Sequence, residues 1–331
     1  MGFFKKSVVM LASALLLTTG TSFASDLEVS KTATTDEILS KIESIGAKNI
    51  YEGGGAFYND DEIPNLNLKN NETAVIHNNG NPMNTNIFEE KQGNELFAIV
   101  VSNINGNNVE SYYISDTETL MDTTLDGMVN DISNGKLKDV YKNDLNKQSR
   151  NSIKTYKWDF YRNLVTGKIQ TGSLYTQLDF SKAGNYNVDG KNSSIWNVVS
   201  RSDVKARSDD RINNTYVRLD AGVGSQKLHD YTPQTTNAST LELSLTKLLN
   251  PKLWTISAGG YTTKSLSPGL ESRYGRWEFK SRIGKQNYWV TAPGIRASNS
   301  KGNFAIKYSQ TMKLNYSEHQ TGVISASVSD R

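Results

Sequence analysis

Apolar and polar positions alternate most clearly between residues 274 and 296. Trp277, Phe279 and Ile283 fall on one side of an extended backbone and charged residues fall on the other, as in a half-buried antiparallel strand. A Gly-Lys-Gln-Asn segment follows, and residues 288–292 resume an aromatic and β-branched run. The pattern predicts a β-hairpin with Trp277, Phe279 and Ile283 in the core.

Short β-like runs separated by turn residues continue through the chain from residue 156 onward. An Asp-Gly pair at 189–190 marks one of these turns. Many short strands without a long amphipathic helix indicate an antiparallel sandwich or barrel. The predicted strands cover residues 157–164, 174–180, 195–200, 215–220, 241–245, 253–258, 276–283, 288–291, 304–308 and 323–328.

Two helical patterns precede residue 136. Residues 34–37 match a Thr-x-x-Glu capping box, and apolar residues at helical spacing follow up to the stop signal Gly46. Residues 115–118 match a second capping box, and an apolar stripe then runs from Met121 to the stop signal Gly135.

Two apolar segments lie between these helices, at residues 96–102 and 109–114. The Asn-Gly pair at 105–106 between them is a strong hairpin signal, because both residue types tolerate positive φ. The sequence before residue 136 therefore predicts a small α+β domain.

The first 24 residues have the composition of a secretory signal peptide. Lys5 and Lys6 precede an apolar run from Val8 to Leu17, and the small residues Ser22 and Ala24 suit a signal peptidase. The sequence predicts cleavage after Ala24 and a secreted, extracellular protein. The mature chain contains no cysteine, which excludes disulfides and thiolate chemistry.

The rest of the chain consists of two halves with net charges of opposite sign. Residues 25–150 carry 10 Lys and Arg against 21 Asp and Glu, a net charge of −11, and residues 151–331 carry 25 against 13, a net charge of +12. All five Trp residues lie in the basic half. We therefore expect a mainly β protein with two domains that attract each other. The predicted organisation is a signal peptide at 1–24, an acidic α+β domain at 25–135, a linker at 136–154 and a basic, aromatic-rich antiparallel β-sandwich or barrel-like domain at 155–331.

Basic residues gather in two stretches of the second half and form the predicted binding surface. A basic surface outside a bacterial cell concentrates near phospholipid headgroups, wall polymers or extracellular nucleic acid. The alternative partner is the acidic half of the same chain, in an intramolecular contact that would mask the surface. The predicted binding residues are Arg201, Lys205, Arg207, Arg211, Arg276, Lys280 and Arg282.

Catalytic and metal-binding patterns are weak. Glycoside hydrolysis needs two carboxylates across a groove, and Glu278 lies between Arg276 and Lys280, which favour its ionised form. No serine elbow accompanies the adjacent His229 and Asp230, and the three histidines have no ligand spacing. Loose calcium binding at the Asp pair 209–210 is less expected than a solvated turn. The sequence predicts no catalytic residue, no metal site and no cofactor.

Two segments alternate as membrane-inserting β-strands do, at Thr240–Leu249 and Thr321–Ser329. An ordinary sandwich strand shows the same alternation. The preferred hypothesis is a secreted non-enzymatic effector that binds an anionic cell surface or membrane, as a toxin or antimicrobial protein that would oligomerise if it forms a pore. The alternatives are a secreted carbohydrate-binding or glycoside-cleaving β-sandwich protein and an envelope or matrix structural protein.

Overall fold

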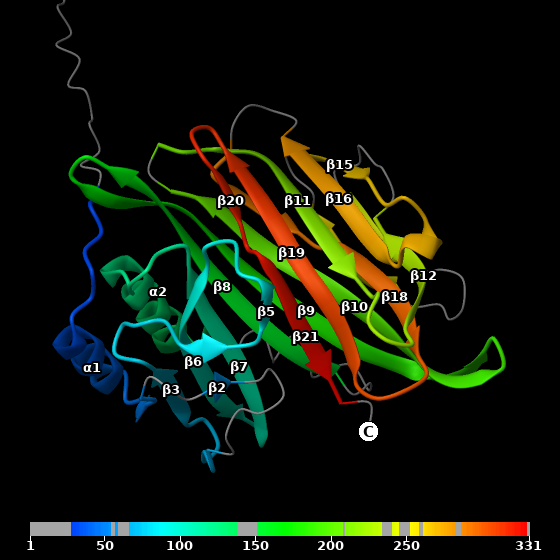
Figure 1. Ribbon diagram of the computed structural model, residues 1–331, viewed down its shortest axis with the longest axis horizontal. Coiled ribbons are helices and arrows are strands. Elements are labelled where there is room, and N and C mark those ends of the chain that lie inside the picture. Colours follow the sequence, from blue (N-terminus) through cyan, green and yellow to red (C-terminus); the bar gives the residue numbers. More distant parts are fainter. Residues whose placement is uncertain are drawn as a thin grey trace, which may run out of the picture.

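The computed structural model consists of two β-sheets packed face to face, with two helices on the outside of the first sheet (Figure 1). It describes residues 28–53, 57–58, 66–137, 151–207, 209–233, 240–244, 252–257, 261–281 and 286–329. Strands account for 60% of the structure and helices for 11%, so the predicted mainly β fold class is confirmed.

The first sheet has ten strands, in the order β1-β3-β6-β7-β8-β9-β10-β18-β12, with β17 also paired to β10. Its acidic-half strands are β1 (Lys48–Tyr51), β3 (Thr73–His77), β6 (Glu95–Ile104) and β7 (Asn107–Ser115). Its basic-half strands are β8 (Asn151–Leu164), β9 (Gly167–Val188), β10 (Lys191–Ala206), β12 (Lys227–Thr232), β17 (Tyr288–Thr291) and β18 (Gly294–Asn299).

The second sheet has seven strands, in the order β15-β16-β11-β19-β21-β5, with β20 paired to β19. Its strands are β5 (Phe88–Glu90), β11 (Ile212–Asp220), β15 (Tyr261–Ser265), β16 (Tyr274–Ser281), β19 (Phe304–Leu314), β20 (Glu318–Gln320) and β21 (Val323–Val328). Two further pairs stand apart from both sheets: β2 (Phe57–Tyr58) with β4 (Asn84–Thr85), and β13 (Thr240–Ser244) with β14 (Lys252–Ser257).

The two helices begin differently. Helix α1 (Thr35–Ser44) has the predicted capping box, in which Thr34 and Glu37 each bond the other's backbone N–H. Helix α2 (Asp122–Ser133) begins after Met121, which forms no side-chain cap. The predicted capping box at Ser115 is wrong, because Ser115 ends β7 and its hydroxyl contacts Thr117 instead.

Both helices pack on the outer face of the first sheet. Ile38 and Ile42 of α1 and Leu125 and Met128 of α2 share a buried cluster with residues of β3, β6 and β7. The Tyr161 hydroxyl on β8 lies 2.7 Å from the hydroxyls of two threonines in the first turn of α2. The helices therefore add a third layer over one end of the sandwich.

The main core lies between the two sheets and includes residues from both halves of the chain. Tyr112 and Ile114 of the acidic half belong to the same buried cluster as Trp158, Trp277 and Tyr308. Strand β7 pairs in parallel with β8, and β5 pairs with β21, so the acidic half supplies strands to both sheets. Most of the predicted linker, residues 138–150, lies outside the described residues, and its last four residues begin β8.

The predicted hairpin between residues 274 and 296 is wrong. Strand β16 pairs with β11 and β15 in the second sheet, whereas β17 pairs with β10 in the first. The alternation within β16 is confirmed, since Trp277 and Phe279 are fully buried. Ile283 lies outside the described residues.

The two turns predicted from Asn-Gly and Asp-Gly pairs are confirmed. Asn105 and Gly106 have φ values of 55° and 83° and join β6 to β7. Asp189 and Gly190 have φ values of 51° and 79° and join β9 to β10. Positive φ at both central residues twists the chain as paired strands require.

Candidate functional site

The first group of predicted basic residues lies at one end of β10 and in the segment after it. Arg201 and Lys205 are exposed on the outer face of the first sheet, because Ser202 and Val204 between them point into the sandwich. Arg207 is exposed beyond the end of β10, and Arg211 is half-buried with its guanidinium donating to a backbone carbonyl.

The second group lies on the other sheet. Arg276 and Lys280 are exposed on the outer face of β16, opposite the buried Trp277 and Phe279. Arg282 lies outside the described residues. Because the two sheets share one core, their outer faces point in opposite directions, so the two groups do not form one surface.

Tyr216 lies at the centre of a polar network on the outer face of the second sheet. The Tyr216 hydroxyl donates to the Glu278 carboxylate at 2.9 Å, and the Asn214 amide donates to the same oxygen at 3.1 Å. Partial burial, followed by the Glu278 hydrogen bond, raises the pKa of Tyr216. Arg276 and Lys313 lie 5.9 and 5.6 Å from the Tyr216 ring centre. Glu278 is thus held in a surface network and is not placed as a general acid.

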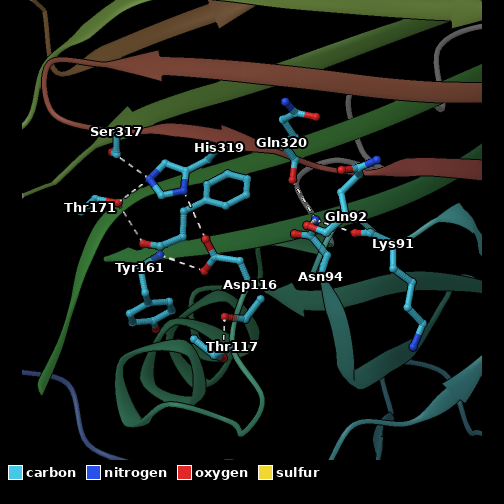
Figure 2. Close-up of polar contacts among 12 residues, drawn as sticks. Lys91, Gln92, Asn94, Asp116, Thr117, Tyr161, Thr171, Ser317, His319 and Gln320 are labelled. Atoms are coloured by element: carbon cyan, nitrogen blue, oxygen red, sulfur yellow. Dashed lines mark hydrogen bonds and ion pairs between the residues drawn. The ribbon is translucent and has the colours of Figure 1, made fainter. Parts of the chain in front are cut away.

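A second polar cluster centres on His319 of β20 (Figure 2). Its Nδ1 lies 3.1 Å from an Asp116 carboxylate oxygen, and its Nε2 lies 2.8 Å from the Thr171 hydroxyl and 2.9 Å from the Ser317 hydroxyl. The other Asp116 oxygen accepts the Tyr161 backbone N–H at 2.9 Å. The Asp116 carboxylate therefore contacts the His319 imidazole, which in turn contacts two hydroxyls.

This order of groups is the one that serine hydrolases use, but the surroundings favour a structural role. His319 is 8% exposed, and its ring stacks on Phe160 at 4.9 Å. Two hydroxyls share Nε2, and the carboxylate also fixes the backbone of β8. The cluster joins the segment after β7 to β8, β9 and β20, and so ties the acidic half to the basic half.

Asn94 makes a second polar link beside the first (Figure 2). Its buried amide donates to the Gln320 carbonyl at 2.8 Å and to the Lys91 carbonyl at 2.8 Å. Nearby, the Lys307 ammonium lies 2.5 Å from the Glu89 carboxylate. The Asn94–Gln320 and Glu89–Lys307 contacts join residues 226 and 218 positions apart in the chain, so no local sequence signal points to them.

Polar groups also lie inside the sandwich. The Tyr308 hydroxyl of the second sheet is fully buried and lies 2.9 Å from the Thr176 hydroxyl of the first. It donates to the Gln310 amide oxygen at 2.5 Å, and the Gln310 amide donates to the Thr215 hydroxyl at 2.8 Å. Burial raises the pKa of Tyr308, which keeps the hydroxyl protonated as a donor. The two sheets are thus joined by hydrogen bonds as well as by apolar packing.

The remaining candidates for metal or acid–base chemistry are occupied by structural contacts. The Asn79 backbone donates to Nδ1 of the buried His77, whose Nε2 lies 2.6 Å from the Asn49 side-chain oxygen. The Arg162 guanidinium lies 3.4 Å from the Asp209 carboxylate and 3.9 Å from the Asp210 carboxylate. Within the described ranges, no group of three or more His, Asp or Glu side chains could hold a metal ion.

The two segments with alternating apolar residues have different places in the fold. Residues 323–328 form β21, whose Ile324, Ala326 and Val328 face the core between β19 and β5. This segment is a sandwich strand. The other segment begins with β13, which pairs with β14 and, among the strands that can be placed, with no strand of either large sheet.

Comparisons with known proteins find only distant similarity. No protein-family model matches the chain, and no curated protein sequence matches it. A solved structure of Clostridium perfringens delta-toxin is similar over 54% of this chain and 86% of its own, with a TM-score of 0.31 and 11% identity. A structure described as a pore forming protein covers the same shares, with a TM-score of 0.30 and 7% identity.

A cohesin module from a Clostridium perfringens family 33 glycoside hydrolase is similar over 40% of this chain and 84% of its own, with a TM-score of 0.24 and 8% identity. At these TM-scores, the similarities carry no argument about function. No helix among the described residues is long and apolar enough to cross a membrane.

Proposed function

We propose that this protein is a secreted, non-enzymatic effector that binds an anionic membrane surface and inserts the β13–β14 hairpin into it. The observation that carries the proposal is the register of that hairpin. Leu241 is opposite Ile256 and Leu243 is opposite Trp254, and these pairs alternate with Thr240–Ser257 and Glu242–Thr255. Alternation of apolar and polar residues along paired strands is what a transmembrane β-barrel requires.

The exposed cations support the binding step. Arg201, Lys205, Arg276 and Lys280 are exposed and make no ion pair with any other residue in the described ranges. The acidic half leaves these four side chains uncovered, so attraction to an anionic surface does not require its removal. Each cation near such a surface contributes about 1 kcal/mol of attraction.

The insertion step can be tested residue by residue, because the mature chain has no cysteine and a single Cys variant carries a single label. An environment-sensitive fluorophore is placed at Leu243→Cys or Glu242→Cys. On vesicles containing phosphatidylglycerol, we expect a blue shift and increased intensity at 243 and a much smaller change at 242. Ser325→Cys on β21 is the matched control and should not change.

Dye release from the same vesicles measures the outcome of insertion. We expect residues 25–331 to release the dye, with more release from anionic than from phosphatidylcholine vesicles. Equal spectra at positions 242 and 243 on membrane-bound protein would contradict insertion of an amphipathic hairpin. Failure to bind either kind of vesicle would overturn the whole proposal.

A further inference from the structure

On the outer face of the second sheet, two cations flank a carboxylate along one strand. Arg276, Glu278 and Lys280 point outward from β16, because the residues between them are buried in the core. Arg276 and Lys280 are exposed and lie four residues apart, which is about 13–14 Å along a strand. Neither of them forms an ion pair in the part of the chain that the structure describes. A ligand that lies along β16 therefore contacts two separated positive charges with one negative charge between them.

Glu278 is held in place by one of its two oxygens. Its Oε1 accepts the Tyr216 hydroxyl at 2.9 Å and the Asn214 amide at 3.1 Å. Among the described residues, no hydrogen bond is formed to Oε2, and the side chain is half-buried at the surface. Lys264 of β15 lies directly opposite Glu278 and is exposed. The carboxylate is therefore a fixed hydrogen-bond acceptor with cations on three sides.

Tyrosine rings position two arginines of this face. The Arg218 guanidinium on β11 lies 3.9 Å from the ring centre of Tyr274 on β16. The Arg276 guanidinium on β16 lies 5.9 Å from the ring centre of Tyr216 on β11. Arg218 and Arg276 are directly opposite each other, an arrangement of like charges that destabilises a sheet and that contacts with the rings partly offset. Because these rings already contact cations, the face favours a partner with anionic groups over one with aromatic bases.

A cavity of about 310 Å³ lies beside Arg218 on the same face, between β11, β19 and β5. Its lining includes Arg218, Asp220, Lys307, Ser309, Glu89 and Glu90. The Arg218–Asp220 pair at 2.7 Å and the Lys307–Glu89 pair at 2.5 Å balance four of these five charged groups, and the fifth is a carboxylate. The cavity therefore disfavours an anion. Its volume and its many hydrogen-bonding groups suit an uncharged unit that carries hydroxyls.

From this arrangement, we infer that the outer face of the second sheet binds a linear acidic polysaccharide whose anionic groups are separated by uncharged sugar units. Arg276 and Lys280 bind two anionic groups, and Glu278 accepts a sugar hydroxyl between them. A polyanion without such spacing places an anionic group beside Glu278, which repels it. The inference goes beyond the proposed membrane function, because Arg201 and Lys205 on the opposite face stay exposed when this face is occupied.

Calorimetric titration of residues 25–331 with three polymers tests the inference. The probes are hyaluronan, which carries a carboxylate on every second sugar, polyphosphate, which carries a charge on every unit, and dextran, which is uncharged. We expect hyaluronan to bind at least about tenfold more tightly than polyphosphate at equal concentrations of anionic groups, and dextran to bind at least about tenfold more weakly than hyaluronan. High salt should weaken the binding of hyaluronan, because two charge contacts contribute to it.

Variants of the two kinds of contact locate the site. Arg276→Gln/Lys280→Gln should weaken hyaluronan binding about tenfold or more. Glu278→Gln keeps an acceptor oxygen but removes the repulsive charge, so hyaluronan binding should stay within about threefold while polyphosphate binding should rise about tenfold. Arg201→Gln/Lys205→Gln removes the same number of charges from the opposite face and should bind hyaluronan as the wild type does.

Several outcomes would overturn the inference. These are no binding of hyaluronan, equal binding of polyphosphate, and full hyaluronan binding by folded Arg276→Gln/Lys280→Gln. Glu118→Gln removes an exposed carboxylate outside this face, so a gain in polyphosphate binding equal to that of Glu278→Gln would show an effect of net charge alone. Vesicle dye release is measured without polysaccharide, so failure of this inference and failure of the membrane proposal give different results.

Discussion

Asp116 and His319 lie 203 positions apart in the chain, yet their side chains are in contact at 3.1 Å. Asp116 belongs to the acidic half and His319 to the last strands of the basic half. The contact therefore joins the two halves of the chain across more than half of its length. Removing this contact should lower the stability of the protein, which can be measured separately from any binding function.

We expect Asp116→Asn to destabilise the protein by about 1–3 kcal/mol, because it weakens the bond to His319 and changes the acceptor of the Tyr161 backbone N–H. Urea unfolding monitored by Trp fluorescence measures the change. The exposed Glu118→Gln is the matched control and should stay within about 0.5 kcal/mol of the wild type. Unchanged stability in Asp116→Asn would mean that the contact does not hold the halves together.

The contacts of His319 also predict that Ser317 does not react as a serine nucleophile. Because Ser317 shares Nε2 of a nearly buried histidine with Thr171, we expect no reaction with a fluorophosphonate probe. Intact mass spectrometry after incubation with the probe shows whether a covalent adduct has formed. An adduct that disappears in Ser317→Ala would contradict the structural role and indicate a hydrolase.

Gly322 should not tolerate even one methyl group. Its φ of +69° already disfavours a side chain by about 1–2 kcal/mol, and a Cβ would overlap the Glu90 carbonyl oxygen of β5. We expect Gly322→Ala to lose at least about 1–3 kcal/mol more than Gly190→Ala. Gly190 has φ of +79° with nothing within 4 Å of the added atom, so it is a control for conformation alone. Equal losses of stability would show that β5 can move away from β21.

The opposite orientation of the two basic groups predicts unequal effects on membrane binding. A flat vesicle surface can contact only one outer face of a sandwich at a time. One of the double variants Arg201→Gln/Lys205→Gln and Arg276→Gln/Lys280→Gln should therefore lose about 2 kcal/mol of binding, or about 30-fold, and the other should lose little. Co-sedimentation with phosphatidylglycerol vesicles at low and high salt measures both. Equal losses would contradict binding through a single face.

His77 predicts a loss of stability in acid. Burial lowers the pKa of His77 below its ordinary value of 6.5, so the unfolded chain takes up a proton at a higher pH than the folded chain does. Stability should fall as the pH drops through about 6.5 and level off only below the lowered folded pKa. Urea unfolding between about pH 5 and pH 8 should show that the free energy of unfolding depends less steeply on pH in His77→Gln than in the wild type. Tyr51→Phe, at an exposed neighbour, should keep the wild-type slope.

Sequence patterns predicted those features that local chemistry determines. The capping box of α1 depends on residues three positions apart, and the Asn105–Gly106 and Asp189–Gly190 turns depend on positive φ at two adjacent residues. The burial of Trp277 follows from alternation within one strand. In each case, the deciding contacts lie within a few positions along the chain.

Sequence patterns failed where the partner strand is chosen by the tertiary fold. Polar residues between β16 and β17 resemble a hairpin turn, but β16 pairs in the second sheet and β17 in the first. Arg201, Lys205, Arg207, Arg276 and Lys280 are exposed and Arg211 is half-buried, yet no local pattern reveals which sheet carries Arg201 and which carries Arg276. The contact between Asp116 and His319 has no spacing rule at all.

The pairing of β7 with β8 and of β5 with β21 changes what a protease could achieve. A cut within residues 138–150 would produce two polypeptides that still share one hydrophobic core. The products would behave as a fragment-complementation pair, with two bands in denaturing electrophoresis and one species in gel filtration. Cleavage there would yield a nicked but assembled protein, and a denaturant would be needed to separate its parts.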